Sequence, residues 1–152
     1  MSTGTVQAFR QYLARPGGGQ FSTEVRSILI QMDFGNAVNA AWQSGDAAPI
    51  RRFLTEFPDT PFAADARLQI EGIAYSRAQQ ANTPAAFRRF LYEYPSGQFA
   101  EQARGQIEIA AYNLAAQQNS SAAMRRFLTE YPSGQLVEQA RYTLKILHDQ
   151  GR

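Results

Sequence analysis

Apolar side chains recur at intervals of three and four residues in short segments of similar sequence. In one of them, Phe87, Phe90, Leu91 and Tyr94 occupy positions i, i+3, i+4 and i+7, which places them on one face of a helix. The same spacing occurs in residues 50–57 and 124–131. A proline follows each segment at once and ends the helix, because it disfavours helical geometry in the preceding residue. The pattern predicts short helices and no strands.

Polar residues mark where further helices begin. One column of hydrogen-bond acceptors precedes each short helix and predicts its N-cap: Thr5, Asp46, Thr83 and Ser120. After each proline, Asp59, Ser96 or Ser133 is the predicted start of a second, longer helix of about 20 residues. Each unit of sequence therefore predicts a pair of helices, one short and one long.

The chain is built from an internal repeat. Phe53-Leu54-Thr55-Glu56-Phe57-Pro58 matches the segments that start at Phe90 and Phe127, each after a further shift of 37 residues. A more divergent copy at the start matches the third copy at a shift of 78, which leaves four extra residues between the first two copies. The predicted units are 5–41, 46–82, 83–119 and 120–148. Repeats of this length stack on their neighbours, which predicts an all-α solenoid of helical hairpins and a single domain over 1–152.

The four extra residues fall in an unusually apolar segment, residues 27–38. Four residues make about one helical turn. Either the long helix of the first unit is longer than the others, or Gly35-Asn36 breaks it.

The F-L-x-x-Y-P turn, followed by Ser-Gly and then alanine, resembles a bacterial variant of the tetratricopeptide repeat. Gly72 and Tyr75 match the glycine and aromatic that the family places three residues apart, whereas the other units keep only the aromatic. The resemblance covers residues 5–148 and implies a right-handed solenoid that recognises and assembles with other proteins. Variants of this kind occur in periplasmic Tol-Pal-associated proteins, in outer-membrane assembly lipoproteins and in the repeat tails of bacterial caspase-like proteins.

Composition argues against most enzymatic chemistry. The chain has no cysteine and one histidine, His148, so thiolate sites and most histidine-based catalytic or zinc sites are excluded. Gly17-Gly18-Gly19 follows a predicted helix and not a strand, which favours a flexible turn over a phosphate loop. A formal net charge of +2 does not suggest nucleic-acid binding. We expect no enzyme activity, no cofactor, no metal and no small-molecule substrate.

The sequence contains no signal-peptide pattern and no stretch long enough for a membrane span, so no membrane insertion is expected. Both a cytoplasmic and a processed extracytoplasmic location remain open.

Paired arginines recur in three units. The second member of each pair has a glutamate four residues later, as in Arg89 and Glu93, and is expected to pair with it. The first members, Arg51, Arg88 and Arg125, have no such partner. They form either a solvated or inter-repeat salt-bridged face, or a surface for a partner's carboxylates, to which the off-stripe Tyr92 is added.

Apolar residues at both ends of the chain suggest self-association, because a terminal repeat normally turns a polar face outward. At one end the candidates are Phe9, Tyr12, Ile28 and Phe34, and at the other they are Tyr142, Leu144 and Leu147. Arg141 joins the second set, since Lys145 replaces the glutamate found four residues after Arg67 and Arg104.

Two functions follow from these candidates. One is a scaffold that stacks end to end into a filament or oligomer. The alternative is a monomeric adaptor whose concave face binds a partner peptide or protein, for which the resemblance suggests the bacterial cell envelope. A repeat domain that accompanies a larger enzyme is a third possibility.

Overall fold

A computed structural model of the chain describes residues 3–15 and 21–151, which form helices and contain no strand. The prediction of an all-α protein is confirmed for these residues. The helices alternate between short and long after the first: α1 (Thr3–Leu13), α2 (Ser22–Ser44), α3 (Ala48–Glu56), α4 (Ala63–Ala81), α5 (Pro84–Glu93), α6 (Ala100–Gln117), α7 (Ser121–Glu130) and α8 (Val137–Asp149).

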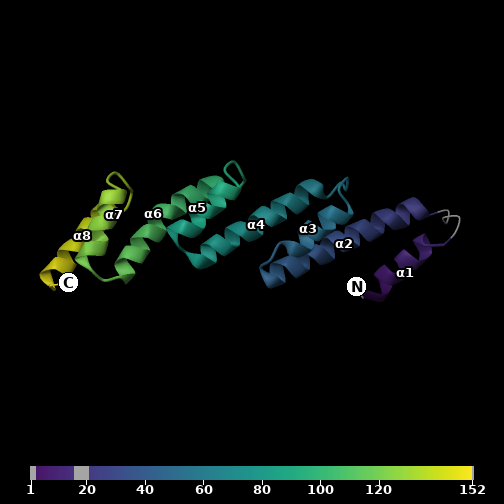
Figure 1. Ribbon diagram of the computed structural model, residues 1–152, viewed down its shortest axis with the longest axis horizontal. Helices are drawn as coiled ribbons and strands as arrows, with labels where there is room; N and C mark the ends of the chain where they lie inside the picture. Colours follow the sequence, from purple (N-terminus) through teal and green to yellow (C-terminus); the bar gives the residue numbers. More distant parts are fainter. Residues whose placement is uncertain (1–2, 16–20, 152) are drawn as a thin grey trace. The chain divides into compact units, whose positions relative to one another are not determined.

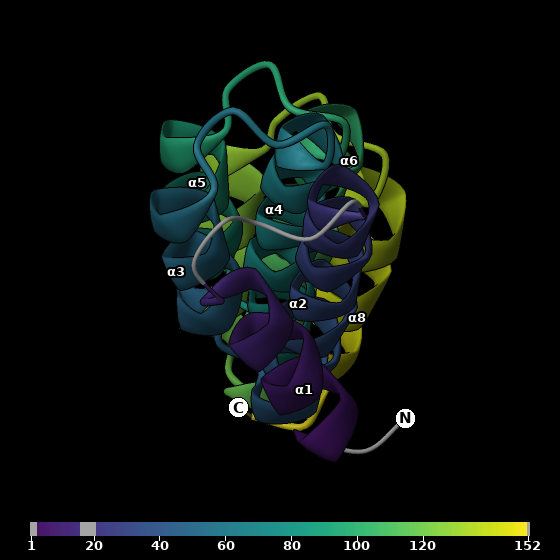
Figure 2. The ribbon, with the colours of Figure 1, turned by 90° about the vertical axis from the view of Figure 1, so that its right-hand side faces the viewer.

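The helices group into two compact units, Met1–Ile73 and Ala74–Arg152, and the division falls within α4. In the first unit, α2 packs against α1 and α3. In the second, α6 packs against α5 and α7, and α7 packs against α8. The chain reverses direction between α2 and α3 and again between α7 and α8 (Figure 1), and Figure 2 shows α3 beside α2. The single domain over 1–152 stays a prediction.

Helices α5 and α7 begin where the polar column predicts, whereas the N-cap of α3 is Ala47, one residue after the predicted Asp46. The side chains of Thr83 and Ser120 accept hydrogen bonds of 3.2 Å from the backbone N–H groups of Ala86 and Ala123. Asp46 accepts one of 3.0 Å from Ala48. These bonds satisfy N–H groups that a helix leaves free in its first turn. The first sequence repeat differs, because α1 begins at Thr3 and not after Thr5.

The side chain of Thr5 and the predicted turn at Gly17–Gly19 lie outside the described residues.

The short helices end just before each proline, as predicted, and the residue that precedes the proline is the C-cap. Phe57, Tyr94 and Tyr131 have φ angles of −128°, −133° and −124° and leave the helical region. The predicted starts of the long helices are wrong by three or four residues. These helices begin at Ala63, Ala100 and Val137, and neither Phe99 nor Leu136 provides a side-chain cap for α6 or α8.

A residue with a left-handed backbone conformation follows the C-terminus of α2, α4 and α6. Gly45, Asn82 and Asn119 have φ angles of 65°, 45° and 48°. Asparagine and glycine tolerate this region better than other residues. A left-handed residue therefore precedes each of the short helices α3, α5 and α7.

Helix α2 is one uninterrupted helix of 23 residues that contains Gly35 and Asn36. The alternative of a longer helix in the first unit is confirmed. Near its C-terminus, the indole Nε1 of Trp42 donates a 2.7 Å hydrogen bond to Oε1 of Gln69 on α4.

A cluster of aromatic rings holds each long helix to the elements that follow it. In the second unit, Tyr75 of α4 stacks on Phe99 with ring centroids 5.0 Å apart and meets the edge of Phe90 at 5.4 Å. In the first unit, Phe34 of α2 makes the equivalent contacts with Phe62 at 5.1 Å and Phe53 at 5.4 Å. Such ring pairs add about 0.5–1.5 kcal/mol beyond the area they bury.

A third cluster has the same plan with one substitution. Tyr112 of α6 meets Phe127 of α7 edge to face at 5.6 Å, and Phe127 stacks on Tyr131 at 5.2 Å. Leu136 takes the place of Phe99 and packs in this core with Tyr112. Phe53, Phe90 and Phe127, which follow one another at the repeat spacing, are therefore core residues.

A hydrogen bond from α6 fixes the turn before α8. Oε1 of Glu108 accepts a 2.7 Å hydrogen bond from the backbone N–H of Leu136, a group that no side-chain cap serves. A Cβ atom at Gly134 would collide with the Glu108 carboxylate. Glycine at 134 therefore lets α6 approach the turn closely.

We predict that Gly134→Ala lowers the free energy of unfolding by about 1 kcal/mol, because it forces Glu108 away from Leu136. The matched control is Gly105→Ala in α6, where an added Cβ has no atom within 4 Å. It should raise stability by roughly 0.5–1 kcal/mol through helix propensity. Urea denaturation measures both, and a Gly134→Ala protein as stable as Gly105→Ala would contradict the role of this contact.

A candidate interaction groove in the second unit

A groove of about 480 Å³ lies between α5, α6 and α7 in the second unit. The three helices and the residues that cap α5 and α6 line it: Thr83, Pro84, Ala85 and Arg88; Ala111, Leu114, Ala115 and Gln118; and Ala123, Arg126, Phe127 and Glu130. The volume is in the range of ligand-binding sites in proteins.

Small and apolar side chains form much of the groove. Ala115 and Ala123 are buried, and alanine at such positions leaves space between helices that larger side chains would fill. Leu114 also lines the groove, yet 42% of its surface is exposed. A half-exposed leucine beside buried alanines offers an apolar contact for an incoming side chain.

Charged groups lie at one side of the groove. The Arg88 guanidinium of α5 donates hydrogen bonds to Oε1 of Glu130 at 2.5 Å and to the Tyr131 hydroxyl at 3.1 Å, both at the end of α7. The hydrogen bond from Arg88 to Glu130 raises the pKa of Arg88, against the opposing effect of burial. Arg88 and Glu130 are each more than half exposed, so we assign this pair less than about 1 kcal/mol of stability.

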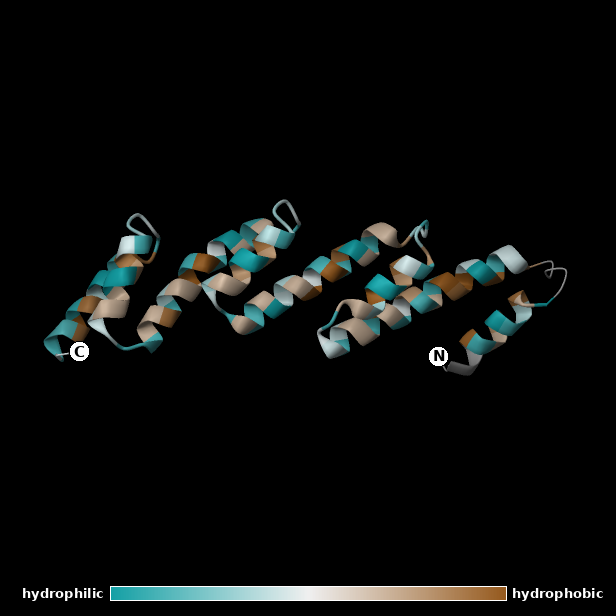
Figure 3. Cartoon of the chain, viewed as in Figure 1, coloured by the Kyte–Doolittle hydropathy of each residue, from teal (hydrophilic) through white to brown (hydrophobic). Residues whose placement is uncertain are grey.

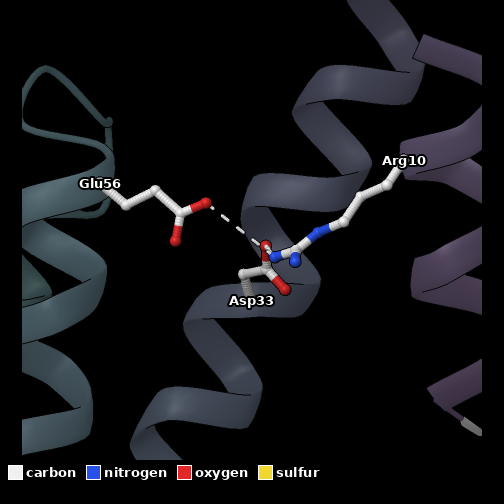
Figure 4. A network of polar contacts seen from close by, with 3 residues as sticks. All are labelled: Arg10, Asp33 and Glu56. Atoms are coloured by element: carbon white, nitrogen blue, oxygen red, sulfur yellow. Dashed lines mark hydrogen bonds and ion pairs between the residues drawn. The ribbon is translucent and has the colours of Figure 1, made fainter. Parts of the chain in front are cut away.

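The first unit contains a related contact. Arg10 of α1 lies 3.0 Å from Oδ2 of Asp33 on α2 and 4.0 Å from Oε1 of Glu56 at the end of α3 (Figure 4). Arg10 and Arg88 occupy matching positions in the sequence repeat, and so do Glu56 and Glu130. In both units, this arginine pairs with a glutamate of the next short helix.

The predicted pairing within helices is only partly correct. Arg89 and Glu93 form the expected i,i+4 ion pair at 3.2 Å. The sequence also pairs Arg126 with Glu130, but Glu130 binds Arg88 across helices. Glu56 likewise lies near Arg10, and no ion pair joins it to Arg52 among the described residues. Arg126 thereby keeps an exposed guanidinium on the groove wall with no ion pair among the described side chains.

The arginine column contains residues in different situations. Arg88 lines the groove but is not free, because Glu130 and Tyr131 engage it. Arg51 and Arg125 are exposed on α3 and α7 and do not line the groove. Tyr92 is 89% exposed, as its position off the apolar stripe predicts, and it also lies outside the groove.

Sequence reasoning missed Leu114 and the role of Arg126. Leu114 has alanine or polar neighbours and no recurring counterpart, so no pattern distinguished it. No sequence pattern signalled the pairing of Arg88 with a residue 42 positions away, because Arg51 and Glu93 stand in the same columns and yet Glu93 pairs with Arg89.

Several side chains expected on self-association surfaces pack against other elements of the chain. Leu147 is 4% exposed in the core with Met124 and Phe127, and Leu144 packs against that core. Phe34 lies in the first aromatic cluster. The expectation that Leu147 is presented at the surface is wrong, because helical period turns it toward the neighbouring helix. Phe34 and Leu144 are half-buried, and their part in self-association stays a prediction.

The remaining candidates for self-association vary in exposure. Phe9 and Tyr12 on α1 are half-buried. Ile28 is 43% exposed and Tyr142 is 67% exposed.

The expectation that Arg141 lacks a partner within its helix is wrong. It pairs with Glu138 of the preceding turn at 2.7 Å. Arg104 likewise pairs with Glu101 and also donates a 2.7 Å hydrogen bond to the Pro95 carbonyl. Both arginines take a glutamate three residues earlier and not the one four residues later that the sequence suggests for Arg104.

No group of three or more His, Cys, Asp and Glu side chains among the described residues is placed to hold a metal ion. No described helix has the length and apolar character that crossing a bilayer requires.

Comparison with known proteins gives no relative: no family model, no curated protein and no solved structure matches the chain.

Burial raises the pKa of Tyr131, and the nearby charge of Glu130 raises it further, while Arg88 acts in the opposite direction. The folded chain therefore holds the phenol proton more tightly than the unfolded chain does. Stability from this group is complete below about pH 10 and is lost as the pH rises through the raised pKa.

We predict that the free energy of unfolding falls between pH 8 and pH 11, and that it falls less in Tyr131→Phe, which has no proton to lose. Denaturant titrations at both pH values give the difference for each protein, so any pH-independent cost of the substitution cancels. Equal losses in the two proteins would show that Tyr131 does not contribute.

Proposed function

We propose that the chain is a tetratricopeptide-like repeat protein, a right-handed solenoid of four helical hairpins, and that it serves as a scaffold for protein–protein interaction. The recurrence of three local features at the repeat spacing supports this organisation: the N-caps at Thr83 and Ser120, the left-handed residues at Asn82 and Asn119, and the aromatic contacts of Tyr75 and Tyr112.

The groove between α5, α6 and α7 is the proposed binding site. The observation that carries this proposal is that the lining combines an exposed apolar side chain, Leu114, with a guanidinium that has no ion-pair partner among the described residues, Arg126. Buried apolar anchors and arginines contribute most to the energy of protein interfaces.

Charge indicates what kind of partner segment fits. Arg88 and Glu130 neutralise each other, which leaves the positive charge of Arg126 on the groove wall. A guanidinium binds a carboxylate through paired hydrogen bonds. The proposed partner is a peptide segment with one apolar side chain for Leu114 and a nearby Asp or Glu for Arg126.

The test is selection of binders from a displayed random peptide library, followed by fluorescence anisotropy with the selected peptides. We expect peptides that combine an acidic and an apolar residue, and binding at least about tenfold weaker in Arg126→Glu and in Leu114→Asp. Arg125→Glu is the matched control, since it makes the same charge change on the adjacent residue outside the groove.

Equal weakening by Arg125→Glu and Arg126→Glu would point to general electrostatic attraction and would reject the groove. Selected peptides that bind both variants and Leu114→Asp as tightly as the unmodified chain would reject it as well.

Exposed apolar residues favour a second candidate, end-to-end self-association. Phe21 is 58% exposed and Tyr142 is 67% exposed, and they lie in the first and second units. The buried position of Leu147 weakens the case for the C-terminal surface. Sedimentation velocity at rising concentration tests it: growing species support self-association, and a constant monomer contradicts it.

A further inference from the structure

One kind of contact recurs between each long helix and the start of the next long helix along the chain. The residue just before the second long helix is covered by an aromatic side chain of the first. Phe34 of α2 stacks on Phe62 with a centroid distance of 5.1 Å, and Tyr75 of α4 stacks on Phe99 at 5.0 Å. Tyr112 of α6 and Leu136 both pack against one buried core in the second unit.

The side chains of α6 show which positions of the next long helix such contacts reach. Tyr112 places its hydroxyl 3.0 Å from Oγ1 of Thr143, which lies seven residues after Leu136. Glu108, one turn before Tyr112, accepts the hydrogen bond from the N–H of Leu136. A carboxylate and an aromatic residue four positions apart thus cover two positions of the next long helix.

The same two positions at the beginning of α2 are not covered by a long helix among the described residues. Phe21 immediately precedes α2 and corresponds to Phe62, Phe99 and Leu136, but its side chain is 58% exposed. Ile28 follows seven residues later, as Thr143 follows Leu136, and it is 43% exposed. Figure 3 shows the apolar stretch in this half of α2.

Part of the aromatic cluster is nevertheless present. Tyr12 of α1 stands in the repeat column of Phe53 and Phe90, and its hydroxyl accepts a 3.4 Å hydrogen bond from the backbone N–H of Phe21. The side chains of Tyr12 and Phe21 therefore correspond to two members of a cluster whose long-helix aromatic residue is absent from the described structure.

The chain segment that carries this face has a small excess of positive charge. Residues 6–28 contain three arginines, Arg10, Arg15 and Arg26, and one carboxylate, Glu24. Asp33 pairs with Arg10, so Arg15 and Arg26 exceed Glu24 by one positive charge. An acidic partner is complementary to this surface.

We propose that Phe21 and Ile28 form a docking site for an amphipathic helix of a partner protein that carries a tyrosine or phenylalanine and, four residues before it, a glutamate. The aromatic ring covers Phe21 and Ile28, and the glutamate takes the place of the Tyr12 hydroxyl as the acceptor for the N–H of Phe21. This proposal rests on the repeat organisation proposed above, but it does not involve the groove.

The chain supplies its own probe. A peptide of residues 100–117, which has Glu108 and Tyr112 at the required spacing, is labelled and titrated with the full chain while anisotropy is recorded. We expect saturable binding that weakens at least about tenfold when the peptide carries Tyr112→Ala and when the chain carries Phe21→Ala. Tyr142→Ala is the control, since this exposed aromatic lies on α8.

Binding that Phe21→Ala leaves unchanged would mean that the peptide enters elsewhere, for example by displacing α6, and would overturn the proposal. Absence of binding at millimolar peptide would overturn it too. Circular dichroism and denaturation of Phe21→Ala verify that the variant is folded, and Ile28→Ser repeats the test at the second position.

Two further measurements distinguish this site from the groove and from a dimer contact. Binding of the peptide to Leu114→Asp at unchanged affinity supports a site independent of the groove, whereas loss of binding there would assign the peptide to the groove. Sedimentation of the chain alone is expected to give a monomer. A dimer that Phe21→Ala abolishes would identify a second copy as the occupant and overturn the partner-helix proposal.

Discussion

The contact on which the rest of the structure depends is the aromatic side chain that each of α2, α4 and α6 places against the helices that follow. Tyr75 shows its reach, because this one ring touches Phe87, Phe90 and Phe99. It ties a long helix to the next short helix and to the turn before the following long helix. The distance along the chain between such partners is small, so these cores form from local contacts. Individual helices of 9 or 10 residues, such as α3 and α5, depend on this packing, since helices of that length are marginal alone.

Much of this fold could be predicted from the sequence. Apolar spacing and proline placed the short helices, and Thr83 and Ser120 provide the caps that their column predicts. The long helices begin late because the residues after each proline form a turn that carries Phe62, Phe99 or Leu136 into a core. A local capping pattern at Ser96 or Ser133 cannot reveal this requirement, because the partner ring lies on the preceding long helix.

The candidate site was less predictable, for a related reason. The i,i+4 rule found the pair of Arg89 and Glu93 but assigned Glu130 to the wrong arginine, since Arg88 of another helix is placed to reach it. That exchange determines which guanidinium remains available on the groove wall. The apolar residues near the chain ends were expected at the surface, but packing against neighbouring helices decides their exposure, as the buried Leu147 shows. Among the described side chains, Arg126 has no ion pair in the groove because Glu130 pairs with Arg88. Phe21 is exposed because no long helix among the described residues covers it.

The proposed repeat organisation requires that equivalent contacts hold each unit to the next, and duplication of one unit is the sharpest test of it. A second copy of residues 83–119 is inserted after Asn119, so that the new junction joins an asparagine to Thr83 as Asn82 does in the chain. We expect one cooperative unfolding transition at higher denaturant concentration, and a helical circular dichroism signal increased by the 10 residues of α5 and the 18 of α6. Loss of cooperative unfolding, or an added segment without helical signal, would contradict the repeat organisation.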